Sequence, residues 1–263
     1  MNQMGKLLEN KIFISTRPAD QSTELESLLT EESATLISMP TIEIRPLPLD
    51  EFSWLQLKNL ESFNWIVFTS PNGLKFFFAR LFDLQNNYGL PSHLKIGVVG
   101  KKTAAHLECY GTSAEFINLG NTAEDFSADF FHRVNLGERV LFPIGNLARS
   151  VIEDKISIKA ICTRVLFYET VMPREINNEA ISLIINNRYD MIILTSPSGC
   201  INLLQLVSEK MDSSTLRLVC IGQTTAAEVI RSGIEPLITA GLANSQGISS
   251  AIINYFQKKT TYK

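Results

Sequence analysis

Six short apolar segments recur along the chain, and each is rich in β-branched residues. Uninterrupted apolar runs of this length are typical of strands that are buried on both faces, as in a parallel sheet. We therefore expect buried strands in these segments. They are residues 11–15, 65–69, 95–99, 139–142, 191–195 and 217–221.

Longer segments with helical periodicity lie between the apolar runs. Regular alternation of strands and helices predicts an α/β protein whose parallel sheets are covered by helices on both sides. Gly111 and Gly233 stand where two of these helices would end, as C-cap glycines do. The expected helices are residues 20–32, 73–82, 103–110, 123–132, 147–154, 177–186, 198–208, 224–232 and 246–257. The aromatic stretch KFFFARLF (75–82) is interpreted as helix core in preference to a surface that stacks on a ligand.

Part of the sequence occurs twice. WIVFTSPNG (65–73) returns as MIILTSPSG (191–199), and KIGVVGKKTAAHLECYG (95–111) returns as RLVCIGQTTAAEVIRSG (217–233). Both pairs are offset by about 125 residues, and at roughly 150 residues per domain the length allows two domains. The repeat therefore predicts two similar α/β domains.

Two segments look like connectors between these domains. Residues 39–45 and 164–173 alternate apolar with polar residues and contain proline, which suits half-exposed edge strands. If they pair as a ladder, one domain is formed by residues 1–38 plus 174–263 and the other by residues 46–163. A tandem division near residue 135 is the alternative.

The repeated Thr-Ser-Pro-x-Gly turn has a physical interpretation. Ser70 is placed to cap a helix, Pro71 suits the first helical position, and Gly73 allows another group to approach closely. Ser196, Pro197 and Gly199 repeat this arrangement. The amides at such a helix N-terminus attract carboxylates or phosphates. The alternative is that the serines only cap helices.

The next strand in each copy ends in a related turn, formed by Gly100 with Thr103 and by Gly222 with Thr224 and Thr225. Ligands of open α/β sheets bind beyond the carboxyl ends of the strands. Two domains that face each other across a hinge would therefore direct four such turns into one cleft, suited to a ligand with many carboxylates or phosphates. The common nucleotide-binding motifs G-x-x-x-x-G-K-[ST] and G-x-G-x-x-G are absent from the sequence.

Composition narrows the function classes. The formal net charge is −3 without a basic stretch, which argues against a nucleic-acid partner. The N-terminus lacks the features of a signal peptide, and no apolar run approaches the ~20 residues of a membrane span. Scattered cysteines and histidines predict neither a metal site nor a disulfide framework, so buried small side chains are the better interpretation of the cysteines. We expect a monomeric cytoplasmic protein without a membrane partner.

An ordered set of motifs resembles the uroporphyrinogen-III synthase family. They are STRPA (15–19), P-x-I-x-I-x-P (40–46), FNWIVFTSPNG (63–73), VVGKKTAAHLECYG (98–111), VLFPIG (140–145), FYET (167–170), YDMIILTSPSG (189–199) and CIGQTTAAEVIRSG (220–233). The resemblance implies two flavodoxin-like parallel-sheet domains joined by a two-stranded β-ladder. It also implies closure of the linear tetrapyrrole hydroxymethylbilane with loss of water and inversion of the last ring, without a cofactor. The substrate would be handed over by the preceding enzyme.

Site residues follow from the same resemblance. Tyr168 matches the family's tyrosine and would assist the leaving hydroxyl, although a tyrosine that merely packs on the hinge is the alternative. Ile144 stands where the family pattern has a basic residue, which would leave an anion contact there to the Gly145 turn and Arg149. The candidates for substrate binding are Thr16, Arg17, Ser70, Pro71, Asn72, Gly73, Gly100, Lys101, Thr103, Gly145, Arg149, Ser196, Pro197, Ser198, Gly199, Gly222, Thr224 and Thr225.

A function from another class also fits the pattern. Two α/β lobes with a double crossover describe non-catalytic domains that bind or sense a small anion. The sequence offers no obvious histidine, cysteine or paired-carboxylate constellation, and this favours the binding module. Formation of the type III isomer from hydroxymethylbilane would distinguish the enzyme from the sensor.

Overall fold

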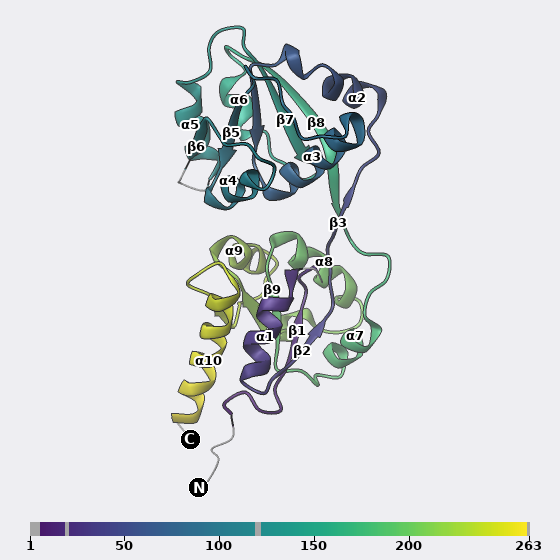
Figure 1. The fold of residues 1–263 in the computed structure, drawn as a ribbon. Helices are drawn as coiled ribbons and strands as arrows, with labels where there is room; N and C mark the ends of the chain where they lie inside the picture. Colours follow the sequence, from purple (N-terminus) through teal and green to yellow (C-terminus); the bar gives the residue numbers. More distant parts are fainter. Residues whose placement is uncertain (1–5, 19–20, 119–121, 262–263) are drawn as a thin grey trace. The chain divides into compact units, whose positions relative to one another are not determined.

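The computed structural model describes residues 6–18, 21–118 and 122–261. The chain divides into two compact units (Figure 1). Unit 1 contains both ends of the chain, Met1–Glu43 and Val171–Lys263, and unit 2 is the continuous segment Ile44–Thr170. Each unit is built around its own sheet.

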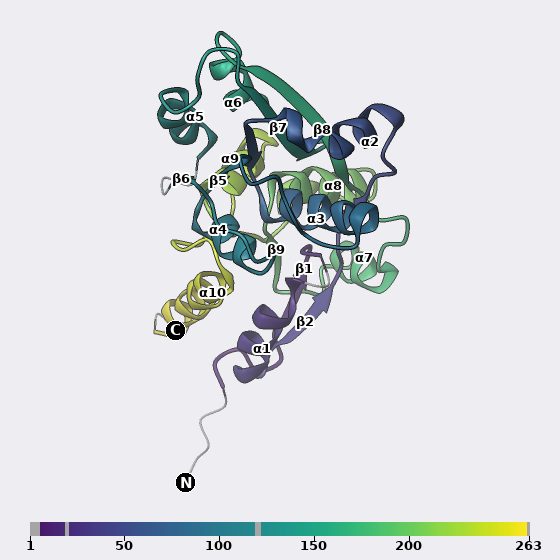
Figure 2. The same ribbon diagram turned by 45° about the horizontal axis from the view of Figure 1, so that its top comes forward.

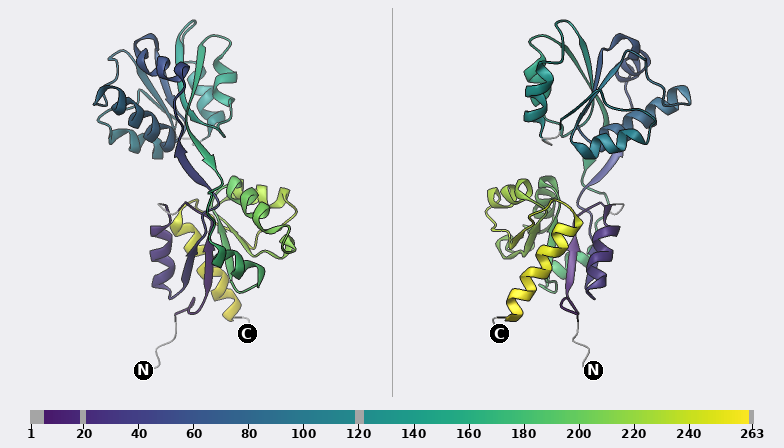
Figure 3. Two further views of the ribbon diagram at one scale, coloured as in Figure 1. Left: turned by 90° about the vertical axis from the view of Figure 1, so that its right-hand side faces the viewer. Right: turned by 60° about the vertical axis from the view of Figure 1, so that its left-hand side comes forward.

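Unit 1 has a five-stranded sheet in the order β11-β10-β9-β1-β2, and its neighbouring strands pair in parallel. Helices α7, α8 and α9 pack on one face, and α1 and α10 pack on the other (Figure 3). The strands are β1 (Ile12–Ser15), β2 (Thr35–Ser38), β9 (Met191–Leu194), β10 (Leu218–Cys220) and β11 (Ile238–Thr239). The helices are α1 (Thr23–Glu31), α7 (Asn178–Ile185), α8 (Pro197–Val207), the 3₁₀ turn η3 (Ser213–Thr215), α9 (Gln223–Arg231) and α10 (Ser245–Thr261).

Unit 2 has a six-stranded sheet in the order β3-β8-β7-β4-β5-β6. Helices α2, α3 and α4 cover one face with a phenylalanine-rich core, and α5 and α6 lie side by side on the other (Figure 2). The strands are β3 (Glu43–Pro46), β4 (Trp65–Phe68), β5 (Lys95–Val99), β6 (Phe116–Asn118), β7 (Arg139–Gly145) and β8 (Ile161–Val171). The helices are α2 (Glu51–Lys58), the 3₁₀ turn η2 (Leu60–Ser62), α3 (Pro71–Gln85), α4 (Lys101–Glu108), α5 (Ala123–Phe131) and α6 (Val151–Ile156).

The two sheets share one spatial order, but the chain enters them at different points. Strands β4, β5, β6, β7 and β8 of unit 2 occupy the places that β9, β10, β11, β1 and β2 occupy in unit 1. Unit 1 is thus a circular permutation of the order found in unit 2, with β3 added at one edge of unit 2. This explains why the sequence repeat begins at β4 in one copy and at β9 in the other.

The predicted connectors form a ladder. Strand β3 is hydrogen-bonded to β8, the amide of Leu47 donates to the carbonyl of Phe167 at 3.0 Å, and Arg45 bonds to Glu169 at 2.7 Å. Strand β8 begins earlier than the predicted connector at 164, because its first half pairs in parallel with β7. The ladder is therefore an extension of the unit 2 sheet. A division near residue 135 would fall inside unit 2.

All six predicted strands are present, and β7 runs three residues further than expected. Each predicted helix is also present, although α6 begins at Val151 where the prediction began at residue 147. Strands β2, β6 and β11 and helix α2 were not predicted. In the part of the chain that the structure describes, none of the helices has the length and apolar composition needed to cross a bilayer.

The core of unit 2 offers a matched test of packing. Phe77 is fully buried and its ring meets the rings of Phe68 and Phe167, whereas Phe52 on α2 is 53% exposed. Removing a buried phenylalanine ring costs about 3–5 kcal/mol of unfolding free energy. We expect Phe77→Ala to lower the stability of unit 2 by that amount in urea denaturation, and Phe52→Ala to change it by less than about 0.5 kcal/mol. Equal losses would contradict the described core.

Candidate functional site

The carboxyl edge of the unit 2 sheet has a switch point between β4 and β7. The chain continues from β4 to β5 on one side and from β7 to β8 on the other. At this point Ser70 caps α3: its Oγ accepts from the amide of Gly73 at 3.1 Å, and Pro71 is the first helical residue. The capping role of Ser70 and the place of Pro71 as first helical residue were predicted from the sequence and are confirmed. Asn72 follows in the first turn.

The first turn of α3 lies against the end of β7. A Cβ on Gly73 would stand 2.7 Å from the carbonyl oxygen of Pro143, closer than such contacts occur. The predicted close approach at Gly73 is therefore an approach to the neighbouring strand. It holds the capped helix end directly beside the residues that follow β7.

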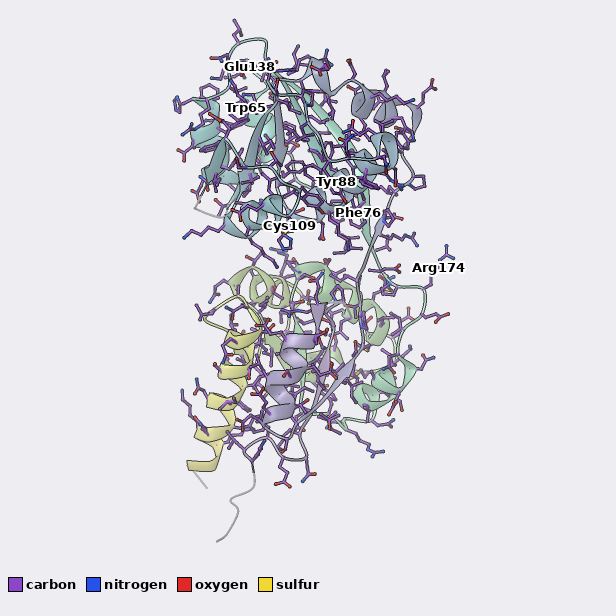
Figure 4. The ribbon with its side chains drawn as sticks, in the orientation of Figure 1. Trp65, Phe76, Tyr88, Cys109, Glu138 and Arg174 are labelled. Atoms are coloured by element: carbon purple, nitrogen blue, oxygen red, sulfur yellow. The ribbon has the colours of Figure 1, made fainter. Side chains whose placement is uncertain are left out.

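Tyr168 lies at this helix end. In the β7–β8 pairing it stands opposite Gly145, where the register shifts, and a Cβ on Gly145 would come within 2.4 Å of its ring. The phenol oxygen is 3.1 Å from Ser70 Oγ, and the ring stacks on Phe76 at 5.4 Å with an interplanar angle of 21° (Figure 4 labels Phe76). One phenol, one hydroxyl and one helix N-terminus thus meet within unit 2.

Unit 1 has the corresponding switch point between β9 and β1. Ser196 Oγ accepts from the amide of Gly199 at 3.0 Å, Pro197 is the first residue of α8, and Ser198 Oγ lies 3.2 Å from Ser196 Oγ. A Cβ on Gly199 would stand 3.5 Å from the hydroxyl oxygens of both Thr16 and Thr41. The geometry of the cap is the same as in unit 2, but within the described part of unit 1 no tyrosine hydroxyl bonds to Ser196.

Thr16 and Thr41 both use their hydroxyls inside unit 1. The Thr16 hydroxyl donates to the carbonyl of Ile193 at 2.9 Å, and the Thr41 hydroxyl donates to the carbonyl of Gly199 at 3.2 Å. Both side chains are buried. These bonds favour a structural role for Thr16, which tethers β1 to β9 beside α8.

The second pair of turns differs from the first. Gly100 and Gly222 are themselves the N-caps of α4 and α9, and no side chain caps either helix. The expected glycine turns are present at both helix starts, but they differ from the first pair because no side chain caps the helix. Thr103 and Thr225 are 3% and 2% exposed, and within the described part of the chain neither hydroxyl forms a hydrogen bond, while Thr224 is exposed.

The candidate basic residues have different surroundings. Arg17 is half-buried and donates to the carbonyl of Gln21 and to Ser245 Oγ at 3.1 and 3.0 Å, and burial lowers its pKa against an opposing effect of Glu24. Arg149 is exposed and pairs with Glu124 at 3.0 Å.

Lys101, the first residue of α4, is exposed. Ile144 is buried in the core of unit 2, so a basic side chain would be poorly accommodated there.

The opposite end of the unit 2 sheet holds a separate polar cluster. Trp65 donates its indole N–H to Glu138 at 3.2 Å, and both residues lie at that end in Figure 4. Burial raises the pKa of Glu138, but hydrogen bonds from Asn135 and the charge of Lys95 outweigh it and lower the pKa overall. An ionised carboxylate with these partners is a structural group, distant from the switch point.

One contact of the site was missed from the sequence. The aromatic run of α3 was interpreted as core, and Phe77 and Phe78 are indeed fully buried. Phe76, however, also stacks on Tyr168. Its position three residues after Gly73 places it on the same face of the helix, which is the signal that could have identified it.

Comparisons with known proteins identify the family. The family model described as uroporphyrinogen-III synthase HemD matches residues 23–249. The uroporphyrinogen-III synthase of Chlorobaculum parvum is 28% identical over 233 residues, which cover 86% of this chain and 91% of that protein. The uroporphyrinogen-III synthase of Synechococcus elongatus is 30% identical over 211 residues, covering 78% and 77%.

Solved structures support the fold. A mutant uroporphyrinogen III synthase from Thermus thermophilus matches with a TM-score of 0.65 and 12% identity, covering 94% of this chain and 99% of that one. The uroporphyrinogen-III synthetase of Helicobacter pylori matches with a TM-score of 0.61 and 15% identity, covering 93% and 99%. The predicted fold class, two α/β units with parallel sheets and a ladder, is confirmed.

The cysteines contribute no reactive group to either switch point. All four are free, Cys200 and Cys220 are buried, and Cys109 is exposed, so the expectation of burial is wrong for Cys109. Among the residues that the structure describes, no group of histidine, cysteine and acidic side chains could hold a metal ion.

Thiol alkylation tests the described exposure of Cys109 and the full or partial burial of the other cysteines. Burial raises the pKa of Cys162 and Cys200 to about 11 and that of Cys220 to about 12. A raised pKa keeps a thiol protonated, and the thiolate is the nucleophile. At pH 8 we expect iodoacetamide to modify Cys109 first in the native protein, and the other three only after denaturation. Mass spectrometry of the peptides measures this, and rapid native alkylation of Cys200 or Cys220 would contradict the described burial.

Proposed function

The chain belongs to the uroporphyrinogen-III synthase family, and we propose that Tyr168 and the amide-rich turns of its two units perform this family's reaction. The enzyme is a cyclising lyase of tetrapyrrole biosynthesis. It closes hydroxymethylbilane to uroporphyrinogen III with loss of water and inversion of the last ring. The comparisons give no support to the alternative of a non-catalytic binding module.

The reaction begins with loss of the hydroxyl group on the first ring. The pyrrole nitrogen supplies the electron pair that expels the hydroxyl and leaves an azafulvene cation. Transfer of a proton to the departing oxygen lets it leave as water, and such general acid help contributes about 10²–10⁴ in rate. The last ring then attacks through its substituted carbon, and the resulting spiro intermediate fragments and rejoins. Ring closure finally releases one proton from the last ring, which restores the acid.

Tyr168 is the proposed acid. A phenol donates a hydrogen bond at neutral pH, and this one lies at the carboxyl edge of the sheet, 3.1 Å from the serine that caps α3. This position carries the proposal, because ligands of open α/β sheets bind at such edges. Unit 1 has the matching cap without a phenol, so the proposed acid belongs to one of two otherwise similar sites.

The substrate's acetate and propionate arms are the proposed ligands of the capped turns. Helix N-termini stabilise carboxylates through their free amides and the helix dipole. The exposed and half-exposed groups suit this role best. They are Arg17, Ser70, Pro71, Asn72, Lys101, Arg149, Ser196, Pro197, Ser198, Gly222 and Thr224. The buried members, Thr16, Gly73, Gly100, Thr103, Gly145, Gly199 and Thr225, shape the same turns.

Three further points are part of the proposal. The protein acts as a monomer in the cytoplasm and receives its unstable linear substrate from the enzyme of the preceding step. The lack of a sustained heptad pattern in the sequence supports a monomer. Light scattering that gives a mass near 29.4 kDa would agree, and a mass near twice this value would contradict it.

An isomer assay tests the activity. Purified protein is coupled to an enzymatic source of hydroxymethylbilane, and the oxidised products are separated by chromatography. We expect the type III isomer to dominate, because orientation of the two chain ends favours attack with inversion. Uncatalysed closure gives the type I isomer. Type I alone, from a folded protein, would contradict the proposed function.

Substitution of Tyr168 tests the acid. Tyr168→Phe removes the phenol oxygen but keeps the ring that packs on Phe76 and Gly145. We expect kcat to fall by about 10²-fold or more, the usual range for loss of a general acid, with little change in the unfolding transition. The matched control is Tyr255→Phe on α10 of unit 1, a helix outside the unit that carries Tyr168, and this variant should retain full activity. Undiminished kcat in Tyr168→Phe would eliminate the assignment.

A further inference from the structure

We propose that Ser70 is a positioning residue that orients the hydroxyl of Tyr168, an inference that rests on the acid role proposed above. Ser70 Oγ stands 3.1 Å from the phenol oxygen and 3.1 Å from the amide nitrogen of Gly73. Its backbone is extended, with φ −158° and ψ 156°, directly before the first turn of α3. One hydroxyl therefore links Tyr168 to a helix N-terminus.

The donors and acceptors of Ser70 are consistent with a hydrogen bond that it donates to the phenol oxygen. A serine hydroxyl has one hydrogen to donate and two lone pairs that accept. The Gly73 amide donates to one lone pair, which leaves Ser70 its hydrogen and a second lone pair for the contact with the phenol oxygen. Either hydroxyl can therefore donate across this contact, and in the proposed arrangement Ser70 is the donor. When Ser70 donates to Tyr168, the hydrogen of the phenol is free to point toward a substrate. Without Ser70 this orientation would have no fixed partner among the contacts described for Tyr168.

The same bond stabilises the product of proton transfer. As the phenol O–H bond breaks, the electron pair remains on the phenol oxygen, which becomes a phenolate. Ser70 then donates to an anionic acceptor, and hydrogen bonds to charged groups are about twice as strong as neutral ones. The amide at the positive end of α3 polarises the serine in the same direction.

The ring of Tyr168 is held by two other contacts, which leave the hydroxyl to Ser70. Phe76 stacks on the ring, and the bare backbone of Gly145 lies against the ring where a Cβ would collide at 2.4 Å. These contacts fix the plane of the ring. The bond to Ser70 fixes the phenol oxygen at its edge.

Unit 1 gives an internal comparison. Ser196 has the same cap geometry on α8, but its nearest hydroxyl partner is Ser198 at 3.2 Å. The cap alone therefore requires no phenol. Among the described residues, the contact between a capping serine and a tyrosine occurs in unit 2 and not in unit 1. Loss of a cap and loss of this contact can consequently be separated by substitution.

Kinetics of single and double variants test the inference. Displacement of a catalytic group by about 1 Å can cost about 10²-fold in rate, so we expect Ser70→Ala to lower kcat by about 10–100-fold with a much smaller change in KM. Ser70→Thr keeps the hydroxyl and should recover most of kcat. Asp50→Ala removes the cap of α2 in the same unit, where Asp50 accepts from the amide of Ser53, and should leave kcat unchanged.

A double-mutant cycle separates positioning from binding. If Ser70 acts through the phenol, Ser70→Ala should change kcat little in a Tyr168→Phe background. An equal loss in both backgrounds would overturn the inference, because Ser70 would then act independently of Tyr168. Full activity of Tyr168→Phe would overturn the proposed acid and this inference together. If Tyr168→Phe loses activity and Ser70→Ala lowers kcat by the same factor in both backgrounds, the role of Ser70 is overturned while the acid role of Tyr168 stands.

A spectroscopic readout does not depend on activity. In protein labelled with ¹³Cζ-tyrosine, the Tyr168 resonance is identified by its absence from Tyr168→Phe. We expect this resonance to shift in Ser70→Ala and in Gly145→Ala, since the new methyl must displace the ring, and to stay in place in Asp50→Ala. An unshifted resonance in Ser70→Ala would show that the contact does not exist in solution and would overturn the inference.

Discussion

At both switch points a helix begins so close to the neighbouring strand that a side chain on its third residue is crowded or excluded. Gly73 approaches the carbonyl of Pro143 within a distance that no Cβ tolerates, and Gly199 faces two threonine hydroxyls and its own capping serine. This close approach brings a serine-capped helix end against the end of a second strand. The polar groups of both switch points depend on this approach.

The duplicated architecture explains why these groups are found in pairs, and its permutation explains where they differ. Strands β7 and β8 of unit 2 correspond to β1 and β2 of unit 1. In unit 2, β8 places Tyr168 beside the capping serine of α3. In unit 1, the segment after β2 places Thr41 beside the first turn of α8. A nearly symmetric framework thus carries a phenol beside the cap of unit 2 and a threonine hydroxyl at the corresponding place of unit 1. Such an arrangement suits a reaction in which one end of a linear substrate loses its hydroxyl while its many carboxylates need similar binding groups.

The sequence predicts a strand or helix only where its burial leaves a regular pattern of apolar residues. Doubly buried strands leave an uninterrupted apolar run, so β1, β4, β5, β7, β9 and β10 were found. Strands β2 and β11 are short and only half-buried, and α2 buries Ser53 and Gln56 while exposing Phe52 and Leu55, the reverse of an amphipathic pattern.

In the candidate site, features that depend on neighbouring residues in the sequence were predicted, and contacts between distant segments were not. The caps at Ser70 and Ser196 follow from local sequence and were predicted correctly. Tyr168 was found only by resemblance, because its approach to Ser70 depends on the register of β8 against β7 and on the irregularity at Gly145. Likewise, the pairing of Arg149 with Glu124 joins segments 25 residues apart and leaves no local signal.

The proposed role of Tyr168 requires the reacting carbon of the substrate to lie beside its phenol oxygen. The most direct measurement is a crystal structure of the protein with its cyclised product bound. We predict that the phenol oxygen of Tyr168 lies about 3–4 Å from the bridging carbon that lost the hydroxyl, the spacing of reacting groups. A product whose bridging carbon lies instead against Ser196 and Thr41, with Tyr168 out of reach, would contradict it.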